Sequence, residues 1–244
     1  MGVTGSYLIS KLSDEHEVTG YERQKEKDFT AVCAWGTTKN ELAEFASDCN
    51  LDFEDYLYHD GQKMEVIIED KNNTKEDKLF IELNGLCTYN KAQLEHDMMK
   101  GHNVIFNKNV KLEEIYDDYD LIIDSTGLRA ILPMSKNRIM IPCLEYRIKY
   151  KKRPYEDFFI KPFKGLTGYF WYFPLNENEA HVGAGDFYKK HNGFHVFLFF
   201  LDIYFHILLL QSYICLKNNI HEGLHLDWVL FLELWVFLRY SFQI

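Results

Sequence analysis

The sequence predicts a mixed α/β fold: an incomplete Rossmann-type nucleotide-binding domain interleaved with an antiparallel sheet, followed by an apolar helical tail. Three observations support this prediction. The chain begins with Gly-x-x-Gly, an amphipathic helical segment and a short strand that ends in an acid. Residues 139–185 contain short runs rich in Tyr, Phe and Ile, separated by Pro and Gly. Residues 194–216 form an apolar run with a single formal charge.

The bulk composition limits the classes of partner. With 47% hydrophobic and 26% charged residues, the 244-residue chain is globular and can build one large domain or two interleaved ones. A net charge of -10 argues against nucleic acid as a partner, because phosphate binding requires a surplus of Lys and Arg. The five cysteines are scattered, without a Cys-x-x-Cys pair or a signal peptide. We therefore expect a reducing, cytoplasmic location and no metal site.

The first 22 residues have the spacing of one half of a dinucleotide-binding motif. In that motif, glycines three residues apart let the backbone approach a pyrophosphate and let the next helix pack closely. Gly2 and Gly5 have this spacing, and the N–H groups at the start of the helix over residues 6–12 favour phosphate. Glu22 follows at the distance where an acid meets the ribose hydroxyls. The first glycine and strand of the motif would precede Met1, so we expect a Rossmann domain without its first strand.

A second segment supports nucleotide binding. The stretch "YDLIIDSTGLR" reads as a buried strand that ends in Asp124, followed by a turn with Gly127. Such a turn can pass close to a cofactor. The structural alternative is a buried strand with an ordinary glycine-capped turn.

Hydrophobic periodicity and composition divide the chain into interleaved domains. We expect residues 1–55 and 85–132 to form the nucleotide-binding part, residues 56–84 and 133–190 the antiparallel sheet, and residues 191–244 the tail. The individual elements that we expect are helices over 40–49 (with Leu42, Phe45 and Ala46 inward) and 90–100, a short apolar strand in "NVIF", and strands over 18–21, 64–68, 79–83, 139–150, 157–163, 168–173 and 179–185.

Four stretches together resemble the geranylgeranyl reductases of archaea. They are "GVTGSYLISKL…EVTGYERQ", "CAWGT", "YDLIIDSTG" and "PFKGLTGYFWYFPL…AHVGAGDFYKKH", in this order between residue 2 and about residue 191. The resemblance implies an FAD-dependent oxidoreductase of the p-hydroxybenzoate hydroxylase-like fold. Such a flavoprotein reduces C=C bonds of geranylgeranyl chains in archaeal membrane lipid biosynthesis, with its FAD reduced by NAD(P)H or another electron donor.

The same resemblance implies a set of site residues. The implied roles are FAD binding for Gly2, Gly5, Glu22, Arg23, Gly36, Asp124 and Gly127, proton donation or pocket shaping near the flavin ring for Cys33, and isoprenoid contact for Tyr169, Trp171, Phe173 and Pro174. Their structural alternatives are a small buried cysteine and ordinary aromatic sheet core. The implied partners are an isoprenoid lipid and a membrane surface to which the cytoplasmic protein binds peripherally.

The sequence also departs from this family. It lacks the first strand, and past about His191 it lacks the glycine-rich segment that returns to the flavin, so we expect truncation at both ends and a reductase that truncation can inactivate. Two alternatives stay open. One is a flavin monooxygenase or halogenase of the same fold, and the other is a non-catalytic, membrane-associated remnant.

The tail itself allows several readings. The run "FHVFLFFLDIYFHILLLQSYICL" carries only Asp202 and, as a helix, is long enough to cross a bilayer. The alternatives are a buried helix, a disordered segment and an out-of-frame sequence. "HEGLH", residues 221–225, matches the zinc-peptidase pattern, but we reject this function because Gly223 weakens a helix and third ligands are scarce downstream.

Overall fold

The computed structural model describes residues 1–69, 76–133, 141–163 and 165–186. Residues 1–190 belong to one compact unit. The predicted tail over 191–244 and its "HEGLH" pattern lie outside the described residues, and the expectations for them stay predictions. In the part of the chain that is described, no helix has the length and hydropathy that a membrane span requires.

The predicted helical segments are confirmed. They are α1 (Val3–Leu12), α2 (Lys39–Asp48) and α3 (Lys91–Met99). Asn90 caps α3, since its side chain accepts a hydrogen bond from the backbone N–H of Gln93 at 3.2 Å. Short 3₁₀ turns lie at Glu26–Asp28, Phe53–Tyr56, Leu112–Glu114 and Gly127–Arg129. The buried core around α2 and α3 consists of Leu42, Ala46, Phe53, Tyr56, Cys87, Tyr89, Leu94 and Met98.

One inward residue on α2 was predicted wrongly. Leu42 and Ala46 are buried, as expected for neighbours one turn apart on a helix. Phe45 is 47% exposed, and its ring lies edge-to-face against Tyr7 with 5.1 Å between centroids. The buried face of α2 is therefore narrower than its apolar residues indicate, and Phe45 lies at the margin of this face.

The half predicted to bind the nucleotide contains a two-stranded parallel sheet. Strand β1 (Gly20–Tyr21) pairs with β7 (Val104–Ile105), the strand predicted in "NVIF". The buried strand predicted in "DLIID" is wrong: residues 120–126 form no strand, and Leu121 and Ile123 are 75% and 50% exposed. A strand is stable only beside a paired neighbour, and no described strand pairs with this segment.

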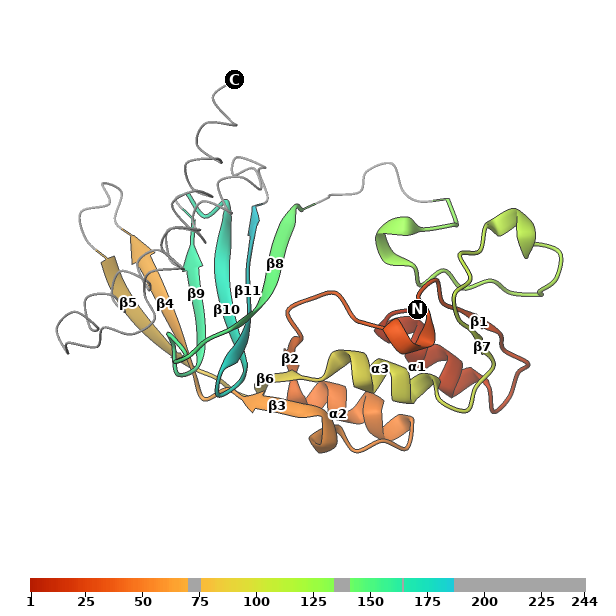
Figure 1. The fold of residues 1–244 in the computed structure, drawn as a ribbon, viewed down its shortest axis with the longest axis horizontal. Helices are drawn as coiled ribbons and strands as arrows, with labels where there is room; N and C mark the ends of the chain where they lie inside the picture. The colour runs from red at the N-terminus through yellow and green to blue at the C-terminus, as the bar shows by residue number, and fades with distance from the viewer. Residues whose placement is uncertain (70–75, 134–140, 164, 187–244) are drawn as a thin grey trace, which may run out of the picture. The chain divides into compact units, whose positions relative to one another are not determined.

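A small antiparallel sheet links the two halves. It consists of β2 (Gly36–Thr38), β6 (Leu86–Tyr89) and β3 (Leu57–Asp60), in the order β2-β6-β3. Strands β3 and β6 also contact β10 of the larger sheet. Figure 1 accordingly shows the small sheet between the helices and the larger sheet.

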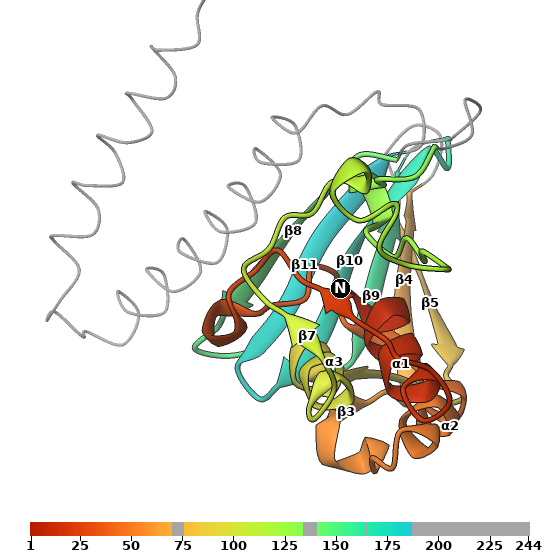
Figure 2. The ribbon, with the colours of Figure 1, turned by 90° about the vertical axis from the view of Figure 1, so that its right-hand side faces the viewer.

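The larger sheet has six strands in the order β5-β4-β9-β10-β11-β8, which can be followed in Figure 2. We expected an antiparallel sheet, and every pair is antiparallel except β4 with β9, which is parallel. The strands are β4 (Lys63–Glu69), β5 (Glu76–Glu82), β8 (Cys143–Lys149), β9 (Phe158–Pro162), β10 (Gly168–Asn176) and β11 (Glu179–Asp186).

The register of the larger sheet decides which side chains share a face. Residues directly opposite each other on paired strands point to the same side. We call one side the Trp171 face. The three strands at the β8 edge contribute Tyr169, Trp171 and Phe173 from β10, His181, Gly183 and Gly185 from β11, and Cys143, Glu145 and Arg147 from β8. The candidate site is built on this face.

Candidate functional site

The two segments predicted to bind the cofactor, one with Gly2 and Gly5 and one with Asp124 and Gly127, lie against each other. Helix α1 begins after Gly2, which provides no side-chain cap for the first-turn N–H groups, and the space around Gly2 is open. Gly5 is buried on α1, and a Cβ there would collide with the side-chain oxygen of Ser125. The loop after Asp124 therefore approaches α1 closely, and the absence of a side chain at Gly5 makes this contact possible.

Asp124 organises this loop. Its carboxylate accepts hydrogen bonds from the N–H and hydroxyl of Thr126 at 3.0 and 2.6 Å, and from the N–H groups of Ile131 and Leu132 at 2.8 and 3.0 Å. Desolvation opposes ionisation of the carboxyl, but these hydrogen bonds outweigh it and lower its pKa. Gly127, with φ of +64°, then reverses the chain in a conformation that favours glycine. Asp124 thus acts on the shape of the loop.

Glu22 follows β1 and is buried close to the start of α1. One carboxylate oxygen accepts a hydrogen bond from the N–H of Gln24 at 2.7 Å, and the other forms an ion pair with the amino group of Met1. The neighbouring Arg23 is exposed. The structure therefore brings Glu22 to the same place as Gly2, with Arg23 at the adjacent surface.

The segment from Cys33 to Gly36 is held in an unusual conformation. Trp35 has φ of +59°, which is costly for a bulky side chain and is often found at functional sites. Its backbone N–H donates to the sulfur of Cys33 at 3.4 Å, and its indole N–H donates to the carbonyl of Ala31 at 3.2 Å. Desolvation raises the pKa of the Cys33 thiol, which therefore keeps its proton at neutral pH.

Gly36 lies where the segment predicted to bind the cofactor meets the strand predicted to bind the lipid. A Cβ at Gly36 would lie 2.9 Å from the ring of Phe173, so glycine permits this contact. On the other side Phe173 packs edge-to-face against Phe158, with 5.1 Å between centroids. Two residues predicted for different roles are thus in direct contact.

The aromatic residues predicted for lipid contact divide between two faces. Tyr169, Trp171 and Phe173 share one face of β10, with 5.8 Å between the ring centroids of Tyr169 and Trp171. Pro174 is fully buried, and strand alternation places it on the opposite face. Its carbonyl accepts a hydrogen bond from the hydroxyl of Thr88 on β6. Pro174 therefore fixes β10 to the small sheet and does not line the Trp171 face.

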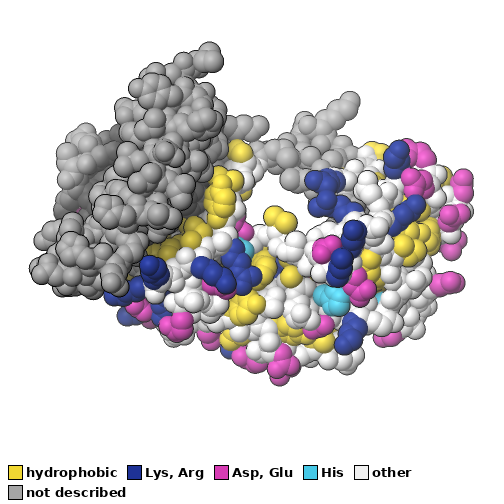
Figure 3. Space-filling view, in the orientation of Figure 1, with side chains coloured by type: hydrophobic (Ala, Val, Ile, Leu, Met, Phe, Trp, Pro, Cys, Tyr) yellow, Lys and Arg dark blue, Asp and Glu magenta, His cyan; other side chains and the backbone are white. Residues whose placement is uncertain are grey.

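Glycines on the neighbouring strand make room for Trp171. A Cβ at Gly183 would collide with Cε2 and Cζ2 of the Trp171 ring, and a Cβ at Gly185 would lie 3.7 Å from its Cζ3. The indole therefore lies across β11, where a side chain at position 183 would exclude it. In Figure 3 the molecule is hollowed between the six-stranded sheet and the part that holds α1, with hydrophobic side chains at the floor.

A charged and aromatic cluster on this face was missed by the sequence analysis. His181 Nδ1 lies 3.0 Å from a carboxylate oxygen of Glu145, and the imidazole ring lies 4.8 Å from the ring of Trp35. The guanidinium of Arg147 lies 5.3 Å from the Trp35 ring centroid and donates to Glu179 at 2.8 Å. The available signal was a single His between Ala180 and Val182 in a buried strand.

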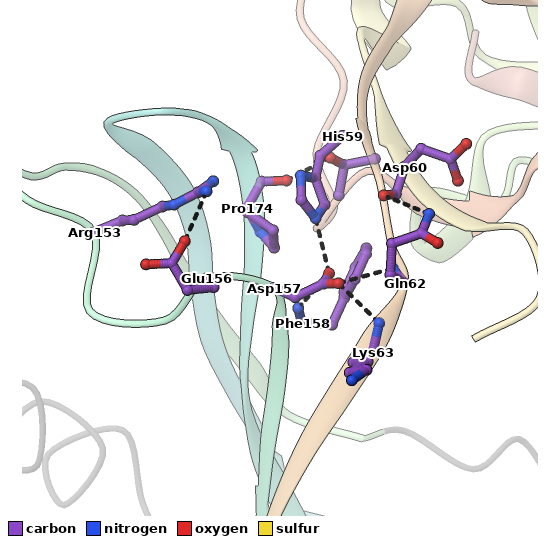
Figure 4. Close-up of polar contacts among 10 residues, drawn as sticks. His59, Asp60, Gln62, Lys63, Arg153, Glu156, Asp157, Phe158 and Pro174 are labelled. Atoms are coloured by element: carbon purple, nitrogen blue, oxygen red, sulfur yellow. Dashed lines mark hydrogen bonds and ion pairs between the residues drawn. The ribbon is translucent and has the colours of Figure 1, made fainter. Parts of the chain in front are cut away.

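A second polar cluster connects the small sheet to the larger one by hydrogen bonds (Figure 4). The carboxylate of Asp157 lies 2.8 Å from Nε2 of His59 and accepts hydrogen bonds of 2.8 Å from the N–H groups of Gln62 and Lys63. These partners lie on β3 and at the start of β4. Asp157 therefore fixes the connection that leads from one half to the other. The described residues contain no group of three or more Cys, His, Asp and Glu able to hold a metal ion.

Comparisons with known proteins place the fold among flavin enzymes. PqsL of Pseudomonas aeruginosa, a probable FAD-dependent monooxygenase, superposes with a TM-score of 0.53 at 11% identity, over 78% of this chain and 59% of that one. The flavin-dependent halogenase CmlS gives 0.54 at 15% identity, over 91% and 46%. The myxobacterial chondrochloren halogenase CndH gives 0.51 at 14% identity, over 82% and 55%.

These likenesses show the fold alone. The chain has the fold of FAD-dependent monooxygenases and halogenases and spans about half to three-fifths of the length of these proteins. A geranylgeranyl bacteriochlorophyll reductase-like protein from Thermoplasma acidophilum is also similar, at 17% identity over 91% of this chain and 59% of that one, but its TM-score of 0.46 adds nothing to the assignment. No protein-family model matches the sequence, and no curated protein matches it.

Proposed function

We propose that the chain is part of an FAD-dependent oxidoreductase that reduces C=C bonds in the geranylgeranyl chains of membrane lipids. The observation that carries this proposal is the contact between Gly36 and Phe173, because it joins the strained Cys33–Gly36 segment to the aromatic Trp171 face. A reductase of an unactivated alkene needs an apolar surface beside its redox cofactor, since positioning supplies much of the rate.

The residues at the start of the chain fit a dinucleotide. The uncapped start of α1 and the open space at Gly2 favour the pyrophosphate, and buried Glu22 is a suitable acceptor for ribose hydroxyls. Exposed Arg23 would meet the adenosine side of the cofactor, and the loop from Asp124 to Gly127 would pass beside it. When bound, reduced FAD supplies a hydride to one alkene carbon.

The protein's own residues would act at the second alkene carbon and along the rest of the isoprenoid chain. The protonated thiol of Cys33 holds a proton at Sγ, near the segment that we assign to the flavin ring. Tyr169 and Trp171 would hold the isoprenoid chain and exclude water, because aromatic rings give large apolar contact with little loss of side-chain entropy. We place the enzyme in the cytoplasm, peripheral to the membrane that contains its substrate, with NAD(P)H or another donor reducing the flavin.

Lipid turnover tests this function. The full chain, reconstituted with FAD and chemically reduced without oxygen, is expected to convert a geranylgeranyl lipid to a product heavier by two hydrogens per reduced bond. Cys33→Ala is expected to slow this conversion, whereas Cys49→Ala, at the C-terminal end of α2, is the matched control. A flavin-loaded protein that leaves the lipid unchanged would contradict the proposal.

A second candidate is a flavin monooxygenase or halogenase acting on an aromatic substrate. It is favoured by the fold, because PqsL, CmlS and CndH have TM-scores above 0.5. Oxygen consumption by the reduced, loaded protein in the presence of an aromatic substrate would support this candidate. Binding to lipid vesicles without any uptake of FAD would instead support a non-catalytic membrane-associated protein.

A further inference from the structure

Two buried nitrogens on the Trp171 face have no hydrogen-bond partner among the described residues. They are Nε2 of His181 on β11 and Nε1 of Trp171 on β10. His181 is 6% exposed and Trp171 is 7% exposed, so bulk water does not satisfy either nitrogen. Unpaired buried polar groups are costly and rare in folded proteins. Two such groups on neighbouring strands indicate a shared partner.

The geometry places the two nitrogens on the same side of Gly183. Trp171 is directly opposite Gly183 in the sheet, and His181 is two residues earlier on β11, so both side chains lie on one face as diagonal neighbours. Cε2 of the indole lies over Gly183, and Cζ3, at the opposite end of the ring, lies toward Gly185. Because Nε1 is bonded to Cε2, the nitrogen edge of the indole lies toward His181.

The imidazole of His181 is held in one orientation by its neighbours. Glu145 on β8 engages Nδ1 at 3.0 Å, which fixes the proton on Nδ1 and leaves Nε2 as an acceptor in the neutral ring. Trp35 closes the other side at 4.8 Å between ring centroids. Arg147 and Lys149, on the same face, engage Glu179 at 2.8 and 3.2 Å. Nε2 therefore remains free to bind a ligand.

We infer that His181 Nε2 and Trp171 Nε1 together bind one hydroxyl group of an otherwise apolar substrate. A hydroxyl oxygen can accept a hydrogen bond from the indole N–H and donate its own proton to the imidazole, so it satisfies both nitrogens at once. The apolar remainder of the ligand would lie along Tyr169 and Phe173 on the same face. This inference rests on the proposed function and narrows its substrate to an amphipathic isoprenoid alcohol or its hydroxyl-bearing lipid.

A matched pair of ligands tests the inference without any turnover. Geranylgeraniol and the hydrocarbon of the same skeleton without the hydroxyl are titrated into the full chain, and binding is followed by tryptophan fluorescence. We expect the alcohol to bind about tenfold more tightly, which is about 1.4 kcal/mol. His181→Phe and Trp171→Phe each keep an aromatic ring at the changed position. In both variants the ratio of the two affinities should fall close to one, while the hydrocarbon still binds. His96→Phe, on α3, is the matched control and should keep the preference.

Nitrogen NMR gives a second readout that a bound water would not reproduce. The Nε2 signal of His181 should move when geranylgeraniol is added and stay in place when the hydrocarbon is added. Equal affinity for the two ligands, or a preference for the alcohol that survives in both variants, would overturn the inference. If the hydrocarbon still binds in that case, the proposed lipid-binding site is not contradicted.

The outcome with aromatic ligands separates this inference from the proposed function. If neither isoprenoid binds, naphthol and naphthalene are compared in the same way. A preference for naphthol that depends on His181 would support the hydroxyl site and contradict isoprenoid reduction. If none of the four ligands binds, the inference itself is overturned.

Discussion

The ring of Phe173 lies against the backbone of Gly36, so close that a Cβ at position 36 would lie 2.9 Å from the ring. The two residues are 137 positions apart in the sequence and belong to different sheets. Their contact brings the Cys33–Gly36 segment to the Trp171 face. The proposed function depends on this contact.

A double-mutant cycle tests this contact. Gly36→Ala is expected to lower the free energy of unfolding by about 1–3 kcal/mol, because the added methyl group is too close to the ring of Phe173. In a Phe173→Ala background the same change should cost much less, since the ring is the near neighbour at this position. Urea denaturation measures all four proteins. Additive effects of the two changes would contradict the contact, and Tyr169→Ala, which Gly36 does not touch, should be additive.

The approach of the Asp124–Gly127 loop to α1 predicts an effect on flavin binding. Gly5→Ala should weaken FAD binding about tenfold or more, because the new methyl pushes Ser125 away from the helix. Ser125→Gly in the same chain removes the colliding side chain and should restore most of the affinity. Flavin fluorescence quenching measures both variants. Unchanged affinity in Gly5→Ala would show that this approach does not form part of the binding site.

Asp157 should make stability depend on acid pH. Desolvation opposes ionisation of this carboxyl, but hydrogen bonds from His59, Lys63, Gln62 and Phe158 outweigh it and lower its pKa. A lowered folded-state pKa gives stabilisation that is complete above the unfolded value of about 3.9 and is lost as pH falls through the folded value. Asp157→Asn should cost about 1–3 kcal/mol at neutral pH and should flatten the pH dependence below about pH 4.

A neighbouring carboxylate supplies the control for this experiment. Glu156 is exposed and pairs only with Arg153, at 3.0 Å, among the contacts shown in Figure 4. Exposed ion pairs contribute about 0–1 kcal/mol, so Glu156→Gln should leave the acid dependence almost unchanged. Equal pH profiles for Asp157→Asn and the unmodified chain would contradict the role given to Asp157.

Cys33 should react slowly with alkylating reagents near neutral pH. Desolvation raises the pKa of its thiol above the ordinary value, so a smaller fraction of the side chain is the reactive thiolate near neutral pH. Iodoacetamide labelling followed by peptide mass spectrometry gives the rate at Cys33 as a function of pH. A rate midpoint at or below the ordinary thiol pKa of about 8.5 would contradict a protonated Cys33.

The local periodicity of the sequence was sufficient to predict most elements. The apolar positions of α1, α2 and α3 recur at helical spacing, and the strands of the larger sheet combine aromatic and β-branched residues with Pro and Gly at their ends. Because these signals lie within each element, they survive without knowledge of the fold. The parallel pairing of β4 with β9 could not be predicted, since it depends on segments about 94 residues apart.

The errors arise where long-range partners decide the outcome. "DLIID" has the apolar run of a buried strand, yet Leu121 and Ile123 are exposed because no described strand pairs with them. Likewise, Pro174 was predicted to contact the lipid because it belongs to the Tyr-x-Trp-x-Phe-Pro pattern. Strand alternation places it on the opposite face of β10. The cluster of His181, Glu145 and Trp35 combines three distant segments, and only the register of β8 with β11 reveals it.

Flavin binding by the full chain tests the central claim most directly. Purified protein is titrated with FAD, and the change in the flavin absorption band is recorded together with circular dichroism to verify folding. We expect saturable binding with one FAD per chain, weakened when Glu22 is changed to Ala, because we propose that Glu22 accepts hydrogen bonds from the ribose hydroxyls. A folded chain that takes up no FAD would contradict it.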